Sequence, residues 1–269
     1  MNQAARPTRP GALLLLLAAA LAATLAATLA APSPARAANK ADAFEGKIRP
    51  VSGQLYGKAG RLELTPSGLL SLNDAFFTKY FGGVKATYHF SEFLSVSGAY
   101  AMGTAARTGS AVVCPANQGC RPASTAELYQ VPGRLTSLAS LEGAWTPVYG
   151  KLNVFAEKVA HFDLGLLAGV DLVGHEAVQA AGAADDLVAA GLKPPTKTTL
   201  GGHVGLGVRL FLGDAVALRW EIKDLVYAVD VPNWQESGRA RRDVQNQLLT
   251  ELGISVFFPF HARPAGGTR

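Results

Sequence analysis

The sequence predicts an all-β protein, an eight-stranded antiparallel up-and-down barrel. Segments of about ten residues recur along the chain, and in each of them apolar and polar side chains alternate with a period of two. Clusters of Gly, Pro, Asn and Asp separate these segments, as expected for turns. No stretch after the N-terminal region has a helical pattern strong enough to organise a domain.

The N-terminal region predicts a cleaved signal peptide over residues 1–37. Arg6 and Arg9 form a basic start, the run 11–32 carries no charge, and "ARA" at 35–37 supplies the small residues that signal peptidase reads. The run is long enough for a retained membrane helix, which is the alternative. Its alanine content and the cleavage pattern that follows favour the signal peptide.

Cleavage changes the charge of the chain. It removes three arginines, so Lys plus Arg falls from 25 to 22 while Asp plus Glu stays at 20. The basic character of the whole sequence therefore belongs largely to the signal peptide, and we expect no nucleic-acid partner.

The two cysteines, Cys114 and Cys120, predict a local disulfide. They belong to an exported chain and are separated by "PANQG", whose Pro, Asn and Gly favour a turn. A metal site is unfavourable because neither a histidine nor a third cysteine is near. The bridge closes a small loop, so it constrains a loop tip more than it stabilises the fold.

The expected strands follow one another with clear apolar and polar faces. Their ranges, in chain order, are 61–70, 83–90, 94–101, 137–145, 161–173, 201–212, 215–227 and 248–260. The apolar faces of the first four are Leu62 and Leu64; Val84, Ala86, Tyr88 and Phe90; Leu94, Val96 and Tyr100; and Leu141 and Trp145. The apolar faces of the next three are Phe162, Leu164, Leu166, Val170 and Leu172; Val204, Leu206, Val208, Leu210 and Leu212; and Val216, Leu218, Trp220 and Ile222. The last strand carries Leu248, Leu252, Ile254, Val256 and Phe258 on its apolar face. Pro66 is expected to weaken the middle of the first strand or to mark a bulge.

The connections alternate between tight turns and long links, a pattern typical of outer-membrane barrels. Tight turns follow the second and sixth strands, whereas long links follow the third, fifth and seventh. The link "TPVYGKLNVFAEKVA" at 146–160 is too long for a tight turn, and a small helix is expected there.

The direction of the apolar face separates a membrane barrel from a soluble carrier. A lipocalin-like barrel turns this face inward around an apolar ligand, whereas a membrane barrel turns it toward lipid. Export, charges of nearly balanced sign on the polar face and aromatic residues near strand ends favour the membrane barrel. The expected lumen charge network is Arg61, Glu63, Lys85, His89, Glu142, Asp163, Asp171, Arg209, Arg219, Glu221, Lys223 and Glu251, and His203 also falls on a lumen position. The expected girdle aromatics are Tyr80, Phe81, Phe90, Tyr100, Trp145, Tyr227, Phe257 and Phe258.

The last strand resembles the terminal-strand signal read by the outer-membrane insertion machinery. The residues that carry this resemblance are Glu251, Gly253, Val256 and Phe258. The chain departs from the usual pattern because it continues through "PFHARPAGGTR" instead of ending at the aromatic residue.

Residues 60–258 resemble the outer-membrane β-barrel domain proteins abundant in myxobacteria and related delta-proteobacteria. The blocks "SLNDAFF…GGVKATYHF" and "YGKLNVF…HFDL" and the Gly-rich strand that ends at "VRLFLG" carry the resemblance. It implies an outer-membrane barrel without enzyme activity. Some relatives belong to the gliding-motility apparatus, where barrels anchor a trans-envelope machine.

Motifs of catalysis are weak in this chain, and we expect no enzyme activity, cofactor or metal. "GHEAV" lacks a second histidine at zincin spacing, "GHVGLG" lacks the third glycine of a nucleotide loop, and no G-x-S-x-G occurs. Arg239, Arg241 and Arg242 form one basic run in an expected outer loop. This run is either a solvated loop or a contact for lipopolysaccharide phosphates.

The sequence thus predicts a signal peptide at 1–37, a periplasmic segment at 38–60, an outer-membrane barrel at 61–260 and a tail at 261–269. Eight strands leave room only for side chains, which favours a structural or partner-anchoring role in the Gram-negative outer membrane. The expected contacts are outer-membrane lipid, the insertion machinery and envelope proteins. A narrow channel, a secreted lipocalin-like carrier and an outer-membrane lipid enzyme are the alternatives.

Overall fold

The computed structural model describes residues 56–115, 119–154, 158–232 and 240–260. The expected signal peptide, the tail at 261–269 and all of the expected periplasmic segment before Tyr56 lie outside these residues. No helix among the described residues is long and apolar enough to cross a membrane.

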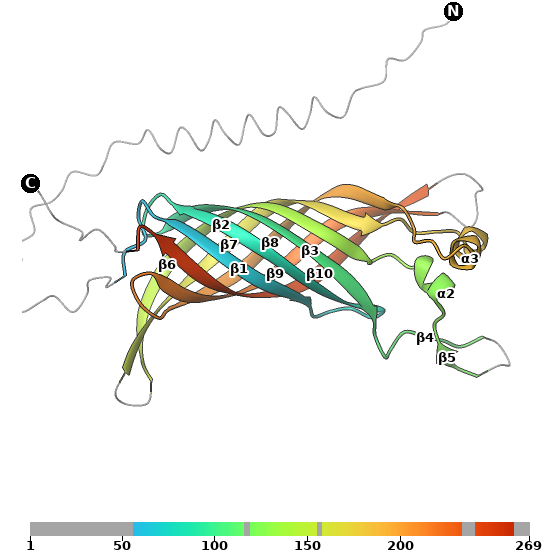
Figure 1. The fold of residues 1–269 in the computed structure, drawn as a ribbon, viewed down its shortest axis with the longest axis horizontal. Helices are drawn as coiled ribbons and strands as arrows, with labels where there is room; N and C mark the ends of the chain where they lie inside the picture. Colours follow the sequence, from blue (N-terminus) through green and yellow to red (C-terminus); the bar gives the residue numbers. More distant parts are fainter. Residues whose placement is uncertain (1–55, 116–118, 155–157, 233–239, 261–269) are drawn as a thin grey trace, which may run out of the picture. The chain divides into compact units, whose positions relative to one another are not determined.

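Eight antiparallel strands form a closed barrel, which confirms the predicted fold class (Figure 1). Each strand pairs with its neighbour along the chain, and the first pairs with the last to close the ring. The strands are β1 Leu62–Ser71, β2 Phe77–His89, β3 Leu94–Arg107, β6 Leu135–Val154, β7 Lys158–Glu176, β8 Thr196–Phe211, β9 Val216–Pro232 and β10 Ala240–Phe258. A closed ring leaves no unpaired sheet edge, which is the requirement for a sheet in lipid.

Pro66 lies within β1, where it weakens the strand pairing locally, the first of the two expected outcomes, and it produces no bulge. It is paired with Val84 of β2, in the register that holds along the whole of β1. On the other side, the pairing with β10 stops after Leu64 and resumes at Ser67 in the same register. Proline has no N–H to donate, so it interrupts one ladder locally, and the register is kept on both sides of the strand.

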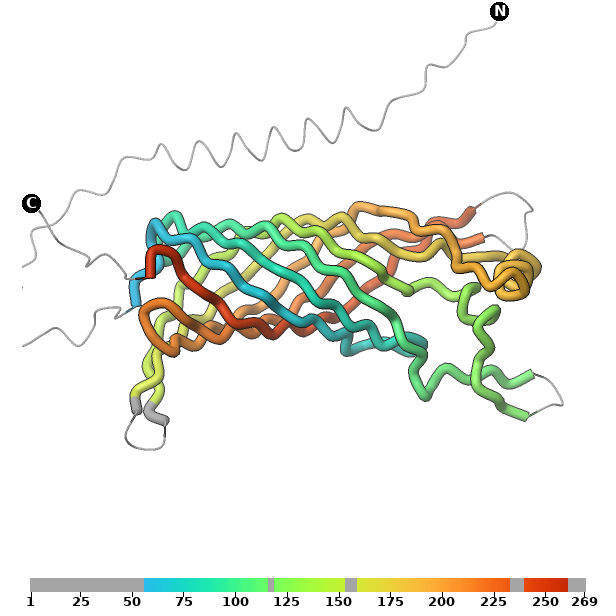
Figure 2. Tube along the Cα trace, viewed as in Figure 1, coloured from blue at the N-terminus to red at the C-terminus, as the bar shows by residue number. Residues whose placement is uncertain are grey.

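The expected helix in the link 146–160 is wrong, because this segment continues β6 and β7 as a long hairpin. After a register shift between Trp145 and Val148, the pairing runs from Val148–Leu164 to Val154–Lys158. The neighbouring strands end earlier, since β3 reaches only Trp145 and β8 only His161. The hairpin therefore projects beyond the barrel wall (yellow-green in Figure 2).

The two ends of the barrel differ. We call the end that carries the turns 90–93 and 212–215, together with the projecting hairpin, the near end. The far end carries the turn 72–76 and the longer loops 108–134 and 177–195. These loops hold the short strands β4 Val112–Val113 and β5 Arg121–Pro122 and the helices α2 Thr125–Tyr129 and α3 Ala181–Ala189.

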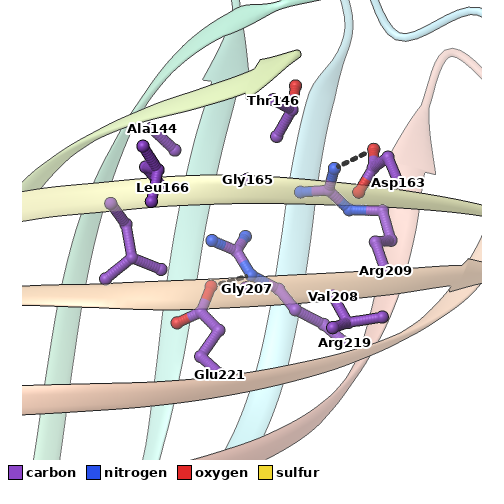
Figure 3. Close-up of a pocket in the computed structure, with 11 residues that line it drawn as sticks. Ala144, Thr146, Asp163, Gly165, Leu166, Gly207, Val208, Arg209, Arg219 and Glu221 are labelled. Carbon is purple, nitrogen blue, oxygen red and sulfur yellow. Dashed lines mark hydrogen bonds and ion pairs between the residues drawn. The ribbon is translucent and has the colours of Figure 1, made fainter. Parts of the chain in front are cut away.

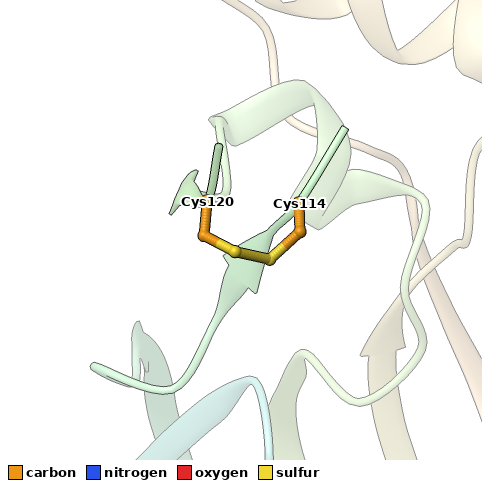
Figure 4. The surroundings of a disulfide bond; sticks show 2 residues. All are labelled: Cys114 and Cys120. Carbon is orange, nitrogen blue, oxygen red and sulfur yellow. A yellow bond between two sulfur atoms is a disulfide. The ribbon is translucent and has the colours of Figure 1, made fainter. Parts of the chain in front are cut away.

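The predicted disulfide between Cys114 and Cys120 is present in the first long loop (Figure 4). In the same loop Ser124 caps α2, and Glu127 completes a capping box. Hydrogen bonds from Arg121, and then from Ser124, lower the pKa of Glu127 to about 2. The far-end loop is thus held by local bonds at its tip.

Candidate functional site

The barrel wall is apolar outside and charged inside. On β8, Val204 and Leu206 are each 61% exposed, whereas Arg209 on the other face is 4% exposed. On β9, Trp220 is 48% exposed and its neighbour Glu221 is 1% exposed. This polarity is the reverse of that of a soluble carrier barrel and matches that of a transmembrane barrel.

The twelve residues of the expected lumen charge network are all buried in the structure. Eleven of them lie on strands, and Arg61 immediately precedes β1. His203 is also buried. Period-two alternation accounts for this placement, because side chains two residues apart on a strand share one face.

Glu221 and Glu142 are the two centres of the ion-pair network in the middle of the lumen. Glu221 contacts Lys85 at 2.6 Å and Lys223 at 2.9 Å, and it also accepts a bond from the Arg219 guanidinium. Glu142 lies 3.3 Å from Lys85, 3.2 Å from Lys223 and 3.4 Å from Arg219. Each carboxylate therefore faces three Lys or Arg side chains, which offsets the cost of burying charge in the lumen.

His203 extends this network toward Asp171. Its Nε2 lies 3.0 Å from Glu142, and its Nδ1 lies 2.7 Å from Asp171. Ionised carboxylates only accept hydrogen bonds, so both ring nitrogens must donate. The geometry thus fits an imidazolium that adds one positive charge to the lumen.

A second cluster of ion pairs lies nearer the near end of the barrel and is centred on Glu63 and Asp163. Figure 3 shows its Arg209–Asp163 pair, together with the Arg219–Glu221 pair of the first cluster. Glu63 contacts His89 at 2.7 Å and Arg209 at 2.9 Å. Arg209 also reaches Asp163 at 2.8 Å. A cavity beside Arg219 and Glu221, whose lining residues are shown in Figure 3, has a volume of about 20 Å³, enough for one water molecule.

Residues just before β1 close the near end of the lumen. The Lys58 ammonium reaches inside to Asp163 at 2.5 Å and to Thr146 at 3.1 Å. Burial lowers the pKa of Lys58, and the charge of Asp163 opposes that shift. Tyr56 stacks on Phe211, with ring centroids 5.4 Å apart. The sequence prediction missed Lys58 because it precedes the first alternating segment.

Two further groups tie the chain to this end of the barrel. The Glu92 carboxylate, in the turn between β2 and β3, accepts bonds from the backbone N–H groups of Lys58 and Ala59 at 2.9 and 3.1 Å. Arg61 donates to the carbonyl oxygens of Asp214 and Pro259, each at 2.7 Å. The segment 58–61 is thus hydrogen-bonded to the turn between β2 and β3, to the turn between β8 and β9, and to the residue that follows β10.

Replacing Glu92 by alanine is expected to speed exchange of the Lys58 and Ala59 amide hydrogens by about tenfold or more. A hydrogen bond to a charged acceptor contributes about 1.5–3 kcal/mol, and this variant removes the acceptor. Hydrogen exchange with mass spectrometry measures the change. Glu127→Ala, at the far end, is the control and should leave the exchange rates of these amides unchanged. Equal exchange rates in the parent protein and both variants would show that Glu92 does not hold these amides.

The far half of the interior contains a large apolar cluster, which the alternation did not predict. A buried cluster there includes Leu69, Phe81, Leu135, Leu138, Val173, Leu225, Tyr227, Val229 and Leu249. Lys79 lies at the same end, paired with Asp74 at 2.5 Å and bonded to Gln247. This apolar cluster fills the lumen between the ion pairs and the far-end loops.

Three of the eight expected girdle aromatics lie inside instead. Phe81, Tyr227 and Phe257 are 5%, 3% and 1% exposed, so their assignment to the girdles is wrong. The reason is the pleat: each occupies the register of the lumen face, next to an outward residue such as Tyr80 or Phe258. Outward positions hold Tyr80, Phe90, Tyr100, Trp145 and Phe258.

Two of the three arginines of the basic run lie on a strand instead of in the expected loop. Arg241 and Arg242 lie on β10 and are paired with Val231 and Asp230 of β9, while Arg239 lies outside the described residues. Both arginines are exposed, and Arg241 approaches Asp243 at 3.8 Å. They remain candidates for contact with anionic headgroups.

The terminal-strand residues divide between the two faces of β10. Glu251 and Gly253 face the lumen, where Glu251 contacts Lys223 at 2.6 Å. Phe258 faces outward, and Val256 shares its register. The pairing of β10 with β1 closes the barrel at these residues.

The histidines of the described chain have structural partners. His161 bonds to the Tyr149 hydroxyl at 2.9 Å, and His175 bonds to the Glu176 carbonyl oxygen at 3.1 Å. His89 and His203 contact carboxylates, and His261 lies outside the described residues. Among the described residues, no group of three or more His, Cys, Asp or Glu is placed to hold a metal ion.

Three solved structures are similar to this barrel at low sequence identity. The N-terminal β-barrel domain of Pseudomonas aeruginosa OprF is 8% identical with a TM-score of 0.42, and the match covers 74% of this chain and 98% of that one. The outer membrane protein OprG of the same species is 14% identical with a TM-score of 0.40, covering 77% and 99%. Neisserial surface protein A is 12% identical with a TM-score of 0.35, covering 73% and 94%. Since these scores are below 0.5, the barrel assignment rests on strand pairing. No protein-family model and no curated protein sequence matches the chain.

Proposed function

We propose that this chain is an integral outer-membrane protein of a Gram-negative bacterium with a structural or partner-anchoring role. The observation that carries the proposal is the filled, ion-paired lumen inside an apolar wall. Buried cations and carboxylates contact one another directly around Glu142 and Glu221. A closed barrel of this polarity is stable in a bilayer, and its packed interior leaves no path for solutes.

The outer-membrane setting is supported by the expected signal peptide and by the asymmetry of the connections. Outer-membrane barrels have short periplasmic turns and longer external loops. The near end would therefore face the periplasm, and α2, α3 and the disulfide would face the exterior. The terminal-strand residues of β10 would serve the insertion machinery.

The projecting hairpin is the part of the molecule that best suits anchoring. Beyond Trp145 and His161 its two strands extend past their barrel neighbours, and Leu152 is 52% exposed. Strands that extend past their neighbours offer backbone groups to an added strand. The resemblance to the myxobacterial barrel-domain family extends the proposal to a trans-envelope assembly of the gliding-motility kind.

A membrane fractionation combined with gel electrophoresis of boiled and unboiled samples tests the membrane assignment. We expect the protein in the outer-membrane fraction, with a band that migrates differently before and after boiling. Planar-bilayer recordings should show no steady conductance, in parent protein or in Arg219→Gln. A soluble periplasmic protein without a boiling shift would refute the assignment, and a conductance altered by Arg219→Gln would favour the narrow channel.

A further inference from the structure

We infer that the outer face of β1, β9 and β10 binds one glycolipid, with an acyl chain in a groove and the sugar against a polar cluster. The inference deepens the proposed function and rests on it, because the occupant is a lipid only if the wall lies in a bilayer. Two observations carry it, a groove and a polar cluster at one end of that groove.

The groove lies on the outward side of the wall and has a volume of about 470 Å³. Gly68 and Leu70 of β1, Trp220 of β9, and Thr250 and Leu252 of β10 line it. Gly68 is paired with Leu252, which is paired in turn with Trp220, so one level of the sheet crosses all three strands. The absent side chain at Gly68 leaves the hollow, and the Trp220 ring bounds it, held by a 2.8 Å bond from its Nε1 to the Thr250 hydroxyl.

The polar cluster begins one level beyond Thr250, toward the far end. Asp224 is paired with Leu248 and projects outward between Ile222 and Val226. Asn246 donates to the Asp224 carboxylate at 2.6 Å, and Asn73 donates to the Asn246 side-chain oxygen at 3.3 Å. Three polar side chains thus adjoin the end of the groove.

Asp224 occupies an unusual position for an ionisable group. Val204, its partner on β8, is 61% exposed, and Val226, one outward position farther along β9, is 42% exposed. An acidic group among lipid-facing aliphatic side chains is unfavourable unless polar groups surround it. Among the described residues only Asn246 bonds to the Asp224 side chain, through one of its two oxygens, which leaves the other oxygen for a ligand.

The chemistry of the cluster favours a sugar over other headgroups. A carboxylate and two carboxamides offer both acceptors and donors, and sugar hydroxyls both donate and accept. A phosphate is a poor fit because Asp224 would repel it. Each carboxamide NH2 has two hydrogens, and the bonds above use one of them; an ammonium only donates, so it could not accept from the second, whereas a sugar hydroxyl could. The ligand class is therefore an acylated sugar of the kind that forms the outer leaflet of this membrane.

Fluorescence quenching by brominated lipid tests the inference, because Trp220 lines the groove. The probe protein carries Trp145→Phe and Trp234→Phe, so that Trp220 is the remaining one of the 3 tryptophans. It is inserted into vesicles of brominated phosphatidylcholine, which is then replaced stepwise by unbrominated lipid A whose phosphates have been removed (called lipid A below) or by unbrominated phosphatidylcholine. We expect lipid A to relieve the quenching at a mole fraction at least about threefold lower than phosphatidylcholine does. A threefold preference corresponds to a difference in binding free energy of about RT ln 3 between the two lipids.

Matched variants separate the groove and the cluster from the rest of the wall. Asp224→Leu and Asn246→Leu should abolish the preference for lipid A, and Gly68→Leu should reduce it by filling the groove. A Cβ added at Gly68 meets only the Phe81 carbonyl oxygen, at 3.9 Å, which is ordinary van der Waals contact. Thr104→Leu and Gly98→Leu place the same side chain on outward positions of β3 and should leave the preference unchanged.

Three results would overturn the inference. Lipid A that is no better than plain phosphatidylcholine would show that no selective site exists. Phosphatidylethanolamine that matches lipid A would assign the cluster to an ammonium headgroup instead of a sugar. A preference that survives Asp224→Leu would place the site elsewhere. Flotation with the vesicles and the boiling shift are measured on the same samples: a parent protein that fails them refutes the proposed membrane placement, whereas one that passes them without a preference refutes the glycolipid site alone.

Discussion

Replacing Glu142 by leucine is expected to lower the free energy of unfolding by about 3–5 kcal/mol, because it removes one negative charge from a buried network and leaves excess positive charge in the lumen. The Glu142 carboxylate contacts Lys223 at 3.2 Å, Lys85 at 3.3 Å and His203 at 3.0 Å, and its side chain is 1% exposed. Urea unfolding in phospholipid vesicles, followed by the boiling-sensitive gel band, measures the change.

Two companion variants identify the cause of the loss. Glu142→Gln keeps the shape and some hydrogen bonds, so it should cost less than the leucine variant. Combining Glu142→Leu with Lys223→Met removes one charge of each sign and should recover part of the lost stability. If the double variant is as unstable as the sum of the single variants, the loss comes from packing and the electrostatic explanation is wrong.

Replacing Leu206 by arginine is expected to destabilise the inserted barrel by about 2–4 kcal/mol. Leu206 is 61% exposed on the outer wall, in the middle of the apolar face of β8 between Leu200 and Leu212. An arginine there meets hydrocarbon if the wall lies in a bilayer, and water if the barrel is soluble. The yield of folded, vesicle-bound protein and its unfolding in urea provide the measurement.

Leu152→Arg is the matched control for this variant. Leu152 is exposed to a similar extent, at 52%, but lies on the projecting hairpin beyond the barrel wall. It should fold and insert like the parent protein. Equal behaviour of the two arginine variants would show that lipid does not cover the wall at Leu206, and would favour the soluble carrier.

The sequence alone predicted the strand count, the apolar and polar faces of each strand, and most of the charged residues that line the lumen. The physical reason is local: consecutive side chains on a strand point to opposite sides, so a run such as Val204 to Leu212 displays its two faces without reference to any other strand. Turn residues separated the runs, and the spacing of the cysteines indicated their disulfide.

Pairing between distant residues was decided by tertiary structure. Glu63 of β1 meets Arg209 of β8 across the lumen, and Lys58 meets Asp163, because barrel closure and strand register set which residues share a level. Alternation within one strand carries no information about the level of another strand. For the same reason the groove beside Trp220 could not be predicted from the sequence. It is lined by β1, β9 and β10, and β1 and β10 are the first and last strands of the barrel.

The extent of the strands was likewise beyond local reading. In the hairpin through Val148 and Leu164, the apolar residues are too few and too closely spaced to distinguish two strands from a loop. The cross-strand pairing is what makes these segments strands. The apolar cluster at the far end brings together side chains from β1, β2, β6, β7, β9 and β10, and only the closed ring makes them neighbours. Sequence determined the faces of this barrel because the faces follow from single strands; the contacts within the lumen and on the wall required the closed ring.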